Sequence, residues 1–193
     1  MELLLASSNQ GKLGEIRQML MPLGISLVDQ SSLNIIDAEE TGSTFHDNAL
    51  IKAHHGAKLS GLPTLADDSG LCIDALNGAP GIFTSMFMKE HGGQAGVFAH
   101  LEQALQGQSK DAHCMTVLAL VTPTGEEHLF EGRMDLTLTF PARGTHGFGY
   151  DPIMVPDGET RTLGEMTREE KQALSHRGRA LRQFLDFMQK HHG

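Results

Sequence analysis

The sequence predicts an α/β fold, and its first thirty residues carry much of that prediction. A short apolar run at 2–6 is followed by turn residues at 7–11, a helical pattern and a second apolar run at 26–29. This strand–loop–helix–strand order is typical of α/β architecture. No internal repeat, low-complexity tract or linker interrupts the rest of the chain, so we expect residues 1–193 to form a single domain.

The first two helices follow from different signals. Leu13, Ile16, Leu20 and Leu23 recur at helical spacing, and Gly24 ends that pattern. A capping box predicts a second helix that runs to about residue 60, and it is formed by Thr44 and Asp47. One face of this helix is polar and carries Asn48, Lys52 and His55. The opposite face is apolar, so it should pack inward, and it carries Phe45, Ala49, Ala53 and Ala57.

The middle of the chain reads as strands and loops. We expect the 63–66 run to lead into Asp67-Asp68-Ser69-Gly70, and a strand to follow at 71–76. Several glycines and Pro80 favour an irregular loop at 77–93, and a short amphipathic helix is expected at 97–105.

The second half begins with a predicted hairpin, with strands at 114–122 and 127–133 around a Pro-Thr-Gly turn. Alternating polarity predicts a half-buried strand at 134–140, and a glycine-rich loop should follow at 144–149. A short apolar segment comes next at 153–155. A capping box at Thr167 and Glu170 starts a helical region. The last helix should bury Leu181, Phe184, Leu185 and Met188.

Composition excludes several classes of function. The formal net charge of −9 disfavours wrapping of a nucleic-acid backbone, so we expect no nucleic-acid partner. An anionic substrate would need a locally basic pocket or a metal ion. Cys72 and Cys114 lie in apolar runs without a C-x-x-C partner, so buried reduced thiols are expected. No apolar run suggests a signal peptide or a membrane span, which predicts a cytoplasmic protein.

A loop after the first predicted strand could bind phosphate. Ser7, Ser8, Asn9, Gln10 and Gly11 lead to Lys12 at the start of a helix, where free N–H groups and a lysine suit an anion. The loop does not match a Walker A motif. A plain strand-to-helix turn with a solvated lysine is the alternative.

An acidic set could bind Mg²⁺. Asp67 and Asp68 follow a predicted buried strand, where carboxylates are costly unless they are hydrogen-bonded, paired or metal-bound. Glu39 could join Asp68 from a separate loop, because Mg²⁺ takes carboxylates together with waters and phosphate oxygens. The alternatives are a turn with Asx-type hydrogen bonds at 67–70 and a solvated charge pair at Glu39-Glu40.

A third set lies near the C-terminus. A glycine-flanked aromatic pair, Phe148 and Tyr150, could offer a stacking face for a base. Donors that could meet oxygens of a base or a phosphate follow at His176 and Arg177. A core-packed Phe148 and an ordinary helix junction are the alternative.

Together and in order, these segments resemble the inosine triphosphate pyrophosphatase family, also called the Ham1 or RdgB-type family. The resemblance spans nearly the whole chain and rests on SSNQGKLGEI (7–16), AEETGSTFHDNALIKA (38–53), LPTLADDSGLCIDALNGAPGI (62–82), GFGYDPI (147–153) and MTREEKQALSHRGRAL (166–181). It implies an elongated mixed β-sheet with flanking helices, two lobes around a central cleft, and usually a homodimer.

The resemblance also implies an activity: Mg²⁺-dependent hydrolysis of inosine, deoxyinosine and xanthosine triphosphates to the monophosphate and pyrophosphate. It implies that Glu39 and Asp68 hold Mg²⁺, that Asp68 is the general base, and that Lys52 faces the cleft as a second catalytic residue. The triphosphate would lie against Ser7, Ser8, Asn9, Gln10, Gly11 and Lys12. Other substrate contacts would come from Ser69, Phe148, Gly149, Tyr150, Asp151, Lys171, His176 and Arg177.

One stretch departs from the family pattern. Where bacterial members usually carry tyrosines and an arginine, this chain has Phe83, Phe87 and Met86. The change supports one rival reading, a nucleotide-binding module without catalysis. A sugar-nucleotide or general triphosphate phosphatase, which would release orthophosphate, is a third hypothesis.

Overall fold

The computed structural model describes residues 2–192 and contains a mixed six-stranded sheet in the order β2-β1-β3-β4-β5-β6. Its strands are β1 (Glu2–Ala6), β2 (Ser26–Asp29), β3 (Thr64–Ile73), β4 (Asp111–Val121), β5 (Glu127–Leu138) and β6 (Met154–Pro156). β1 pairs in parallel with β2 and β3, whereas β5 and β6 are antiparallel. The α-helices are α1 (Gln10–Leu20), α2 (Phe45–Ser60), α3 (Thr84–Glu90), α4 (Gln94–Ala104), α5 (Arg168–Leu174) and α6 (His176–His192). The α/β class predicted from the sequence is therefore confirmed.

The chain divides into two compact units. The first unit comprises Met1–Asp68, Thr116–Glu131 and Ala180–Gly193. The second comprises Ser69–Met115 and Gly132–Arg179. The single domain and the central cleft stay predictions of the sequence.

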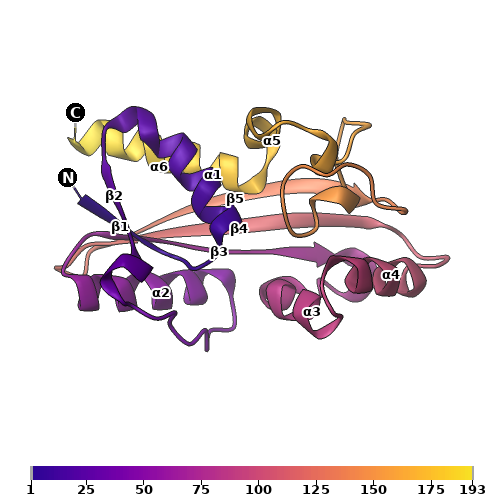
Figure 1. Cartoon of the computed structure of the whole chain (residues 1–193), viewed down its shortest axis with the longest axis horizontal. Coiled ribbons are helices and arrows are strands. Elements are labelled where there is room, and N and C mark those ends of the chain that lie inside the picture. The colour runs from indigo at the N-terminus through magenta and orange to yellow at the C-terminus, as the bar shows by residue number, and fades with distance from the viewer. Residues whose placement is uncertain (1, 193) are drawn as a thin grey trace. The chain divides into compact units, whose positions relative to one another are not determined.

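The first unit has a core on each side of its strands. Figure 1 shows α1 and α6 on one side of these strands and α2 on the other. Under α1 and α6 the core is made of large residues, among them Leu13, Phe130 and Phe184. Under α2 it is made of small residues such as Ala53 and Ala66, which let the helix approach the strands closely.

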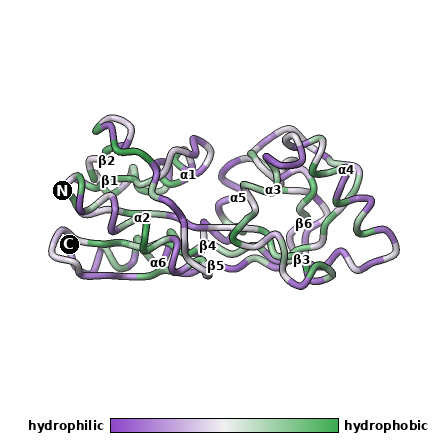
Figure 2. The backbone as a smooth tube through the Cα atoms, turned by 90° about the horizontal axis from the view of Figure 1, so that it is seen from below, coloured by the Kyte–Doolittle hydropathy of each residue, from purple (hydrophilic) through white to green (hydrophobic). Residues whose placement is uncertain are grey.

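The second unit has its own core between α4, the strands and the 140–166 segment. It includes Leu101 of α4, Cys114 of β4, Leu136 of β5 and Met154 of β6. Both cysteines are free and buried, as the sequence predicts. Along the helices of both units, hydrophobic and hydrophilic stretches alternate in Figure 2, as expected for helices that lie on a core.

Several sequence predictions are confirmed closely. β1, β2 and the hairpin of β4 and β5 lie where their patterns place them. The Thr44–Asp47 capping box is present, and Gly61, with a φ of 69°, is the C-cap that follows α2. The Thr167–Glu170 box likewise starts α5. In α6, Leu181, Phe184 and Met188 are buried, and Leu185 packs against the same cluster.

Other predictions are wrong in instructive ways. Asp67-Asp68-Ser69-Gly70 is not a turn, because β3 runs through it without a break. The segment 77–93 is not wholly irregular, since it contains α3, and α4 begins three residues earlier than expected. The half-buried strand predicted at 134–140 is present up to Leu138, but it is the continuation of the hairpin strand β5 and not a separate strand. At 67–70, strand formation overrides the local turn residues.

No helix within residues 2–192 is long and apolar enough to cross a membrane.

The close approach of α2 to the strands makes a first prediction. A Cβ added at Gly56 would lie 2.7 Å from Thr64 Cγ2 and 2.9 Å from Leu4 Cδ2. Gly56→Val should therefore lower the free energy of unfolding by about 1–3 kcal/mol through overpacking. Lys58→Val, on the exposed face of the same helix, should cost only about 0.5 kcal/mol. Urea denaturation measures both, and equal stability of the two variants would contradict the packing account.

Candidate active site

A cluster of one lysine and three acidic residues lies in the first unit, and we call it the acid–lysine cluster. Lys52 Nζ lies 3.1 Å from Asp68 Oδ1 and 3.2 Å from Glu40 Oε1. The same ammonium donates to the backbone carbonyl of Asp67 at 2.7 Å. Lys52 thus has three oxygen partners, which suits a cation that is largely buried.

The strand geometry separates the two aspartates. Successive side chains of a strand point to opposite faces, so Asp67 and Asp68 face different helices. Asp67 Oδ1 lies 2.5 Å from Lys12 Nζ on α1, whereas Asp68 meets Lys52 on α2. The continuous strand β3 therefore gives each buried carboxylate its own lysine.

Asp68 carries a buried carboxylate whose pKa is shifted from its ordinary value. It is only 4% exposed, and among residues 2–192 no hydrogen-bond donor reaches its buried Oδ2 atom. Burial raises the pKa of Asp68 to about 6, and Glu40 adds to the rise, while Lys52 and Lys12 act in the opposite direction. Burial lowers the pKa of Lys52, but the neighbouring carboxylates, with Asp68 first, offset this and raise it.

The polar face of α2 holds the acidic segment 36–42. Asn48 accepts a hydrogen bond from the Gly42 N–H at 2.8 Å, and His55 Nε2 lies 3.1 Å from the carbonyl oxygen of Ile36. Lys52 lies between them on the same face and contacts Glu40. Asn48, Lys52 and His55, which the helical spacing places on one face, thus hold the 36–42 segment together.

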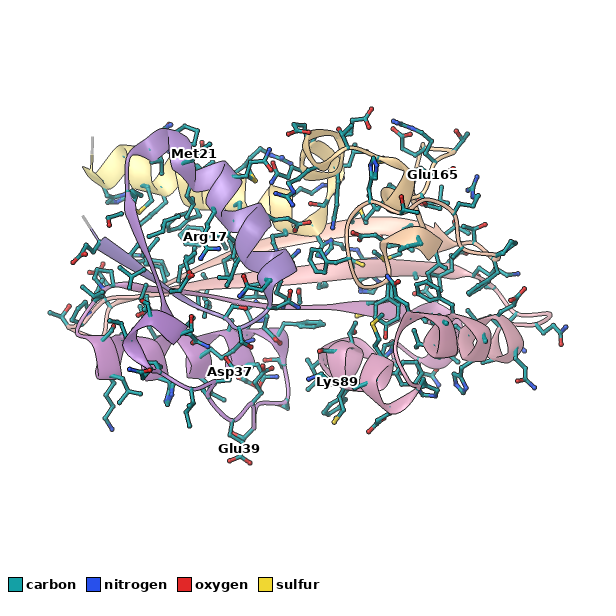
Figure 3. The ribbon with its side chains drawn as sticks, in the orientation of Figure 1. Arg17, Met21, Asp37, Glu39, Lys89 and Glu165 are labelled. Carbon is teal, nitrogen blue, oxygen red and sulfur yellow. The ribbon has the colours of Figure 1, made fainter. Side chains whose placement is uncertain are left out.

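The structure distinguishes the two glutamates of this segment. Both glutamates are exposed, but Glu40 contacts Lys52, whereas Figure 3 shows the side chain of Glu39 pointing away from the chain. Of the two, only Glu40 belongs to the acid–lysine cluster. From the sequence we expect Glu39 to be the metal ligand. Two adjacent glutamates, however, carry no signal that tells which of them contacts Lys52.

The 7–12 loop forms the start of α1. Asn9 is the N-cap, and its side chain accepts from the backbone N–H of Lys12 at 3.1 Å. The Ser8 hydroxyl donates to Asp37 at 2.5 Å, and Gln30 also donates to Asp37. The loop therefore presents a capped helix N-terminus with a lysine, and Asp37 is a partner that the sequence did not reveal.

A second set of candidate residues lies in the second unit, around Phe148. Asp151 Oδ2 accepts from Lys171 Nζ at 2.6 Å and from the Phe148 N–H at 2.9 Å. Lys171 Nζ lies 4.4 Å from the centroid of the Phe148 ring. The buried ion pair thus fixes both a cation and an aromatic face, a combination able to meet a base edge and a base plane.

The neighbouring positions complete this set. Arg177, 3% exposed, donates to the hydroxyl of Ser69 at 2.9 Å, and its guanidinium carbon lies 5.8 Å from the Phe148 centroid. His176 precedes it at the start of α6 and is buried. Tyr150 is also buried and donates from its hydroxyl to the carbonyl oxygen of Thr84 at 2.9 Å. Burial raises the pKa of Tyr150.

These features define an α/β protein whose mixed sheet carries a buried acid–lysine cluster. The model of the Ham1 family matches residues 3–187, so the chain belongs to the Ham1 family.

Relatives agree with this assignment. The dITP/XTP pyrophosphatase of Streptomyces coelicolor is 48% identical over 186 residues, which cover 93% of this chain and 93% of that protein. The dITP/XTP pyrophosphatase of Agrobacterium fabrum is 44% identical over 201 residues, which cover 95% and 94%.

Solved structures agree as well. The HAM1 protein from Coxiella burnetii superposes with a TM-score of 0.90 at 39% identity, and the match covers 98% of this chain and 99% of that one. The nucleoside-triphosphatase, or dITP/XTP pyrophosphatase, from Mycobacterium abscessus gives a TM-score of 0.75 at 44% identity and covers 96% and 99%.

Proposed function

We propose that this protein hydrolyses non-standard purine nucleoside triphosphates (ITP, dITP and XTP) to the monophosphate and pyrophosphate, and so removes deaminated purines from the nucleotide pool. Relatives that match over more than nine-tenths of the chain are named dITP/XTP pyrophosphatases. The observation that carries the proposal is the buried carboxylate of Asp68, which has a raised pKa and is held by Lys52. A base with a pKa near the working pH suits proton abstraction from water.

The phosphate chemistry is assigned to the first unit. The 7–12 loop offers the N-terminus of α1 and the Lys12 side chain to the triphosphate. Asp68 takes a proton from a water molecule whose oxygen attacks the α-phosphorus, and the bond to the bridging oxygen breaks so that pyrophosphate leaves. Lys52 and Lys12 offset the negative charge that develops on the leaving group.

A magnesium ion fits the residues of this unit. Within residues 2–192 no group of three or more metal-ligating side chains is present, but Mg²⁺ commonly uses one or two carboxylates together with waters and phosphate oxygens. Asp68 offers a carboxylate oxygen that no donor in the described part of the chain reaches. Asp68 with a glutamate of the 39–40 pair would hold the ion, which would supply charge neutralisation at the phosphates.

Base recognition is assigned to the second unit. Phe148 offers a stacking face, and Lys171, His176 and Arg177 are donors suited to a 6-keto oxygen or to the sugar. Adenine would place its 6-amino donor against such a donor and leave both unsatisfied. Selectivity for inosine and xanthosine over adenosine follows from this arrangement, with Ser69, Gly149, Tyr150 and Asp151 as further members of the site.

The activity itself is tested by a substrate panel. With Mg²⁺, the protein should release pyrophosphate from ITP, dITP and XTP much faster than from ATP. Asp68→Asn should lower kcat by about 10²–10⁴, because a general base contributes a factor of that size, while the circular dichroism spectrum stays unchanged. Orthophosphate as the product would indicate a general phosphatase, and binding without turnover would indicate a nucleotide-binding module. Wild-type activity of Asp68→Asn would reject the role of this carboxylate.

The two glutamates give a matched test of the metal site. The sequence assigned the metal to Glu39, but the contact with Lys52 favours Glu40. Glu40→Gln should raise the Mg²⁺ concentration needed for half-maximal activity by about tenfold or more, since losing one coordinating charge weakens a hard-cation site. Glu39→Gln, adjacent in the chain and exposed, should change it less than twofold on the same scale. A larger rise in the required Mg²⁺ concentration for Glu39→Gln than for Glu40→Gln would instead support Glu39 as the metal ligand.

A homodimer and a cytoplasmic location complete the proposal. The homodimer rests on the family resemblance, and sedimentation velocity tests it.

A further inference from the structure

The segment that departs from the family pattern contacts the loop that carries Phe148. Tyr150 donates from its hydroxyl to the carbonyl oxygen of Thr84 at 2.9 Å. Gln94, the first residue of α4, donates from its side-chain amide to the carbonyl oxygen of Gly149 at 2.7 Å. Both contacts lie within the second unit, and they grip the two residues that directly follow Phe148.

Thr84 is itself anchored to β3. Its hydroxyl donates to the carbonyl oxygen of Gly81 at 2.6 Å and accepts from the N–H of Leu71 at 2.9 Å. A Cβ at Gly70 would lie only 2.1 Å from the Gly81 oxygen, so the backbones of the two segments are in direct contact. The 81–94 segment is therefore fixed to β3 at Gly70 and Leu71, directly after Ser69.

The loop needs such support because of its glycines. Gly147 and Gly149 have φ values of 73° and 61°, a region that is open to glycine but leaves the chain with more conformational freedom to lose. Asp151 fixes the loop on one side of Gly149 through the Phe148 N–H. Gln94 holds the carbonyl of Gly149 itself, the glycine that lies between Phe148 and buried Tyr150.

We propose that Gln94 is a positioning residue for base binding: by holding Gly149 it keeps the Phe148 ring in place over Lys171. Tyr150 works with it as a buried tether to Thr84. This inference rests on the proposed function, in which Phe148 stacks on the base. Through Thr84 and Gln94, it gives the divergent segment and the start of α4 that follows it a role in substrate affinity without any contact to the substrate.

The test is Gln94→Glu, which keeps the side-chain length and removes the N–H donor. An acidic residue in the first turn of a helix is favourable, so the variant should be at least as stable as the wild type. Its KM for ITP should nevertheless rise about 5- to 10-fold, the effect of one lost hydrogen bond, with kcat within about twofold. The inhibition constant of inorganic tripolyphosphate should not change, because tripolyphosphate carries no base.

Gln103→Glu is the matched control, since Gln103 is an exposed residue near the other end of α4. It should leave KM unchanged. A rise in KM accompanied by an equal rise in the tripolyphosphate constant, or a loss of stability in step with KM, would overturn the positioning role.

A readout without turnover separates this inference from the proposed function. Hydrogen–deuterium exchange of the 147–151 amides should be faster in Gln94→Glu than in Gln103→Glu. If the wild type releases no pyrophosphate from ITP, the proposed function fails, and the exchange result still decides whether Gln94 holds the loop. Unchanged exchange would reject the inference whatever the activity.

Discussion

The contact between Lys52 and Asp68 is the interaction on which the chemistry of the first unit depends. A buried carboxylate without a partner would be protonated at neutral pH and would be costly to fold. Lys52 limits this cost, and the surrounding oxygens of Asp67 and Glu40 keep the lysine charged in turn. The result is an acid whose pKa lies near 6, far enough above its ordinary value to exchange a proton close to neutrality.

The packing of α2 against β3 positions Lys52 and Asp68 for this contact. Small residues on α2 let the helix lie close to β3. The Lys52 side chain on α2 therefore reaches the Asp68 carboxylate on the strand. The alternation of β3 sends Asp67 to α1 and Asp68 to α2, which gives adjacent acids separate partners. The polar face of α2 also holds the segment that carries Glu40. Packing and charge placement are thus consequences of the same helix–strand pair.

Much of this could be predicted from the sequence. The strand–loop–helix–strand start, both capping boxes and the two faces of α2 are local patterns, and the structure confirms them. The course of β3 through Asp67-Asp68-Ser69-Gly70 could not be predicted, because turn-forming residues there are outweighed by pairing and by the two lysines. Nor could the choice between Glu39 and Glu40, or the hold of Gln94 on Gly149, since these depend on which side chains meet in three dimensions.

The most direct measurement of the central claim is an NMR titration of the Asp68 carboxyl carbon in the metal-free protein. We expect a pKa of about 6, because burial outweighs the attraction of Lys52. Addition of Mg²⁺ should lower that pKa, since a bound cation favours the charged carboxylate. A pKa at the ordinary value near 3.8 that Mg²⁺ does not move would contradict both the buried base and its role at the metal.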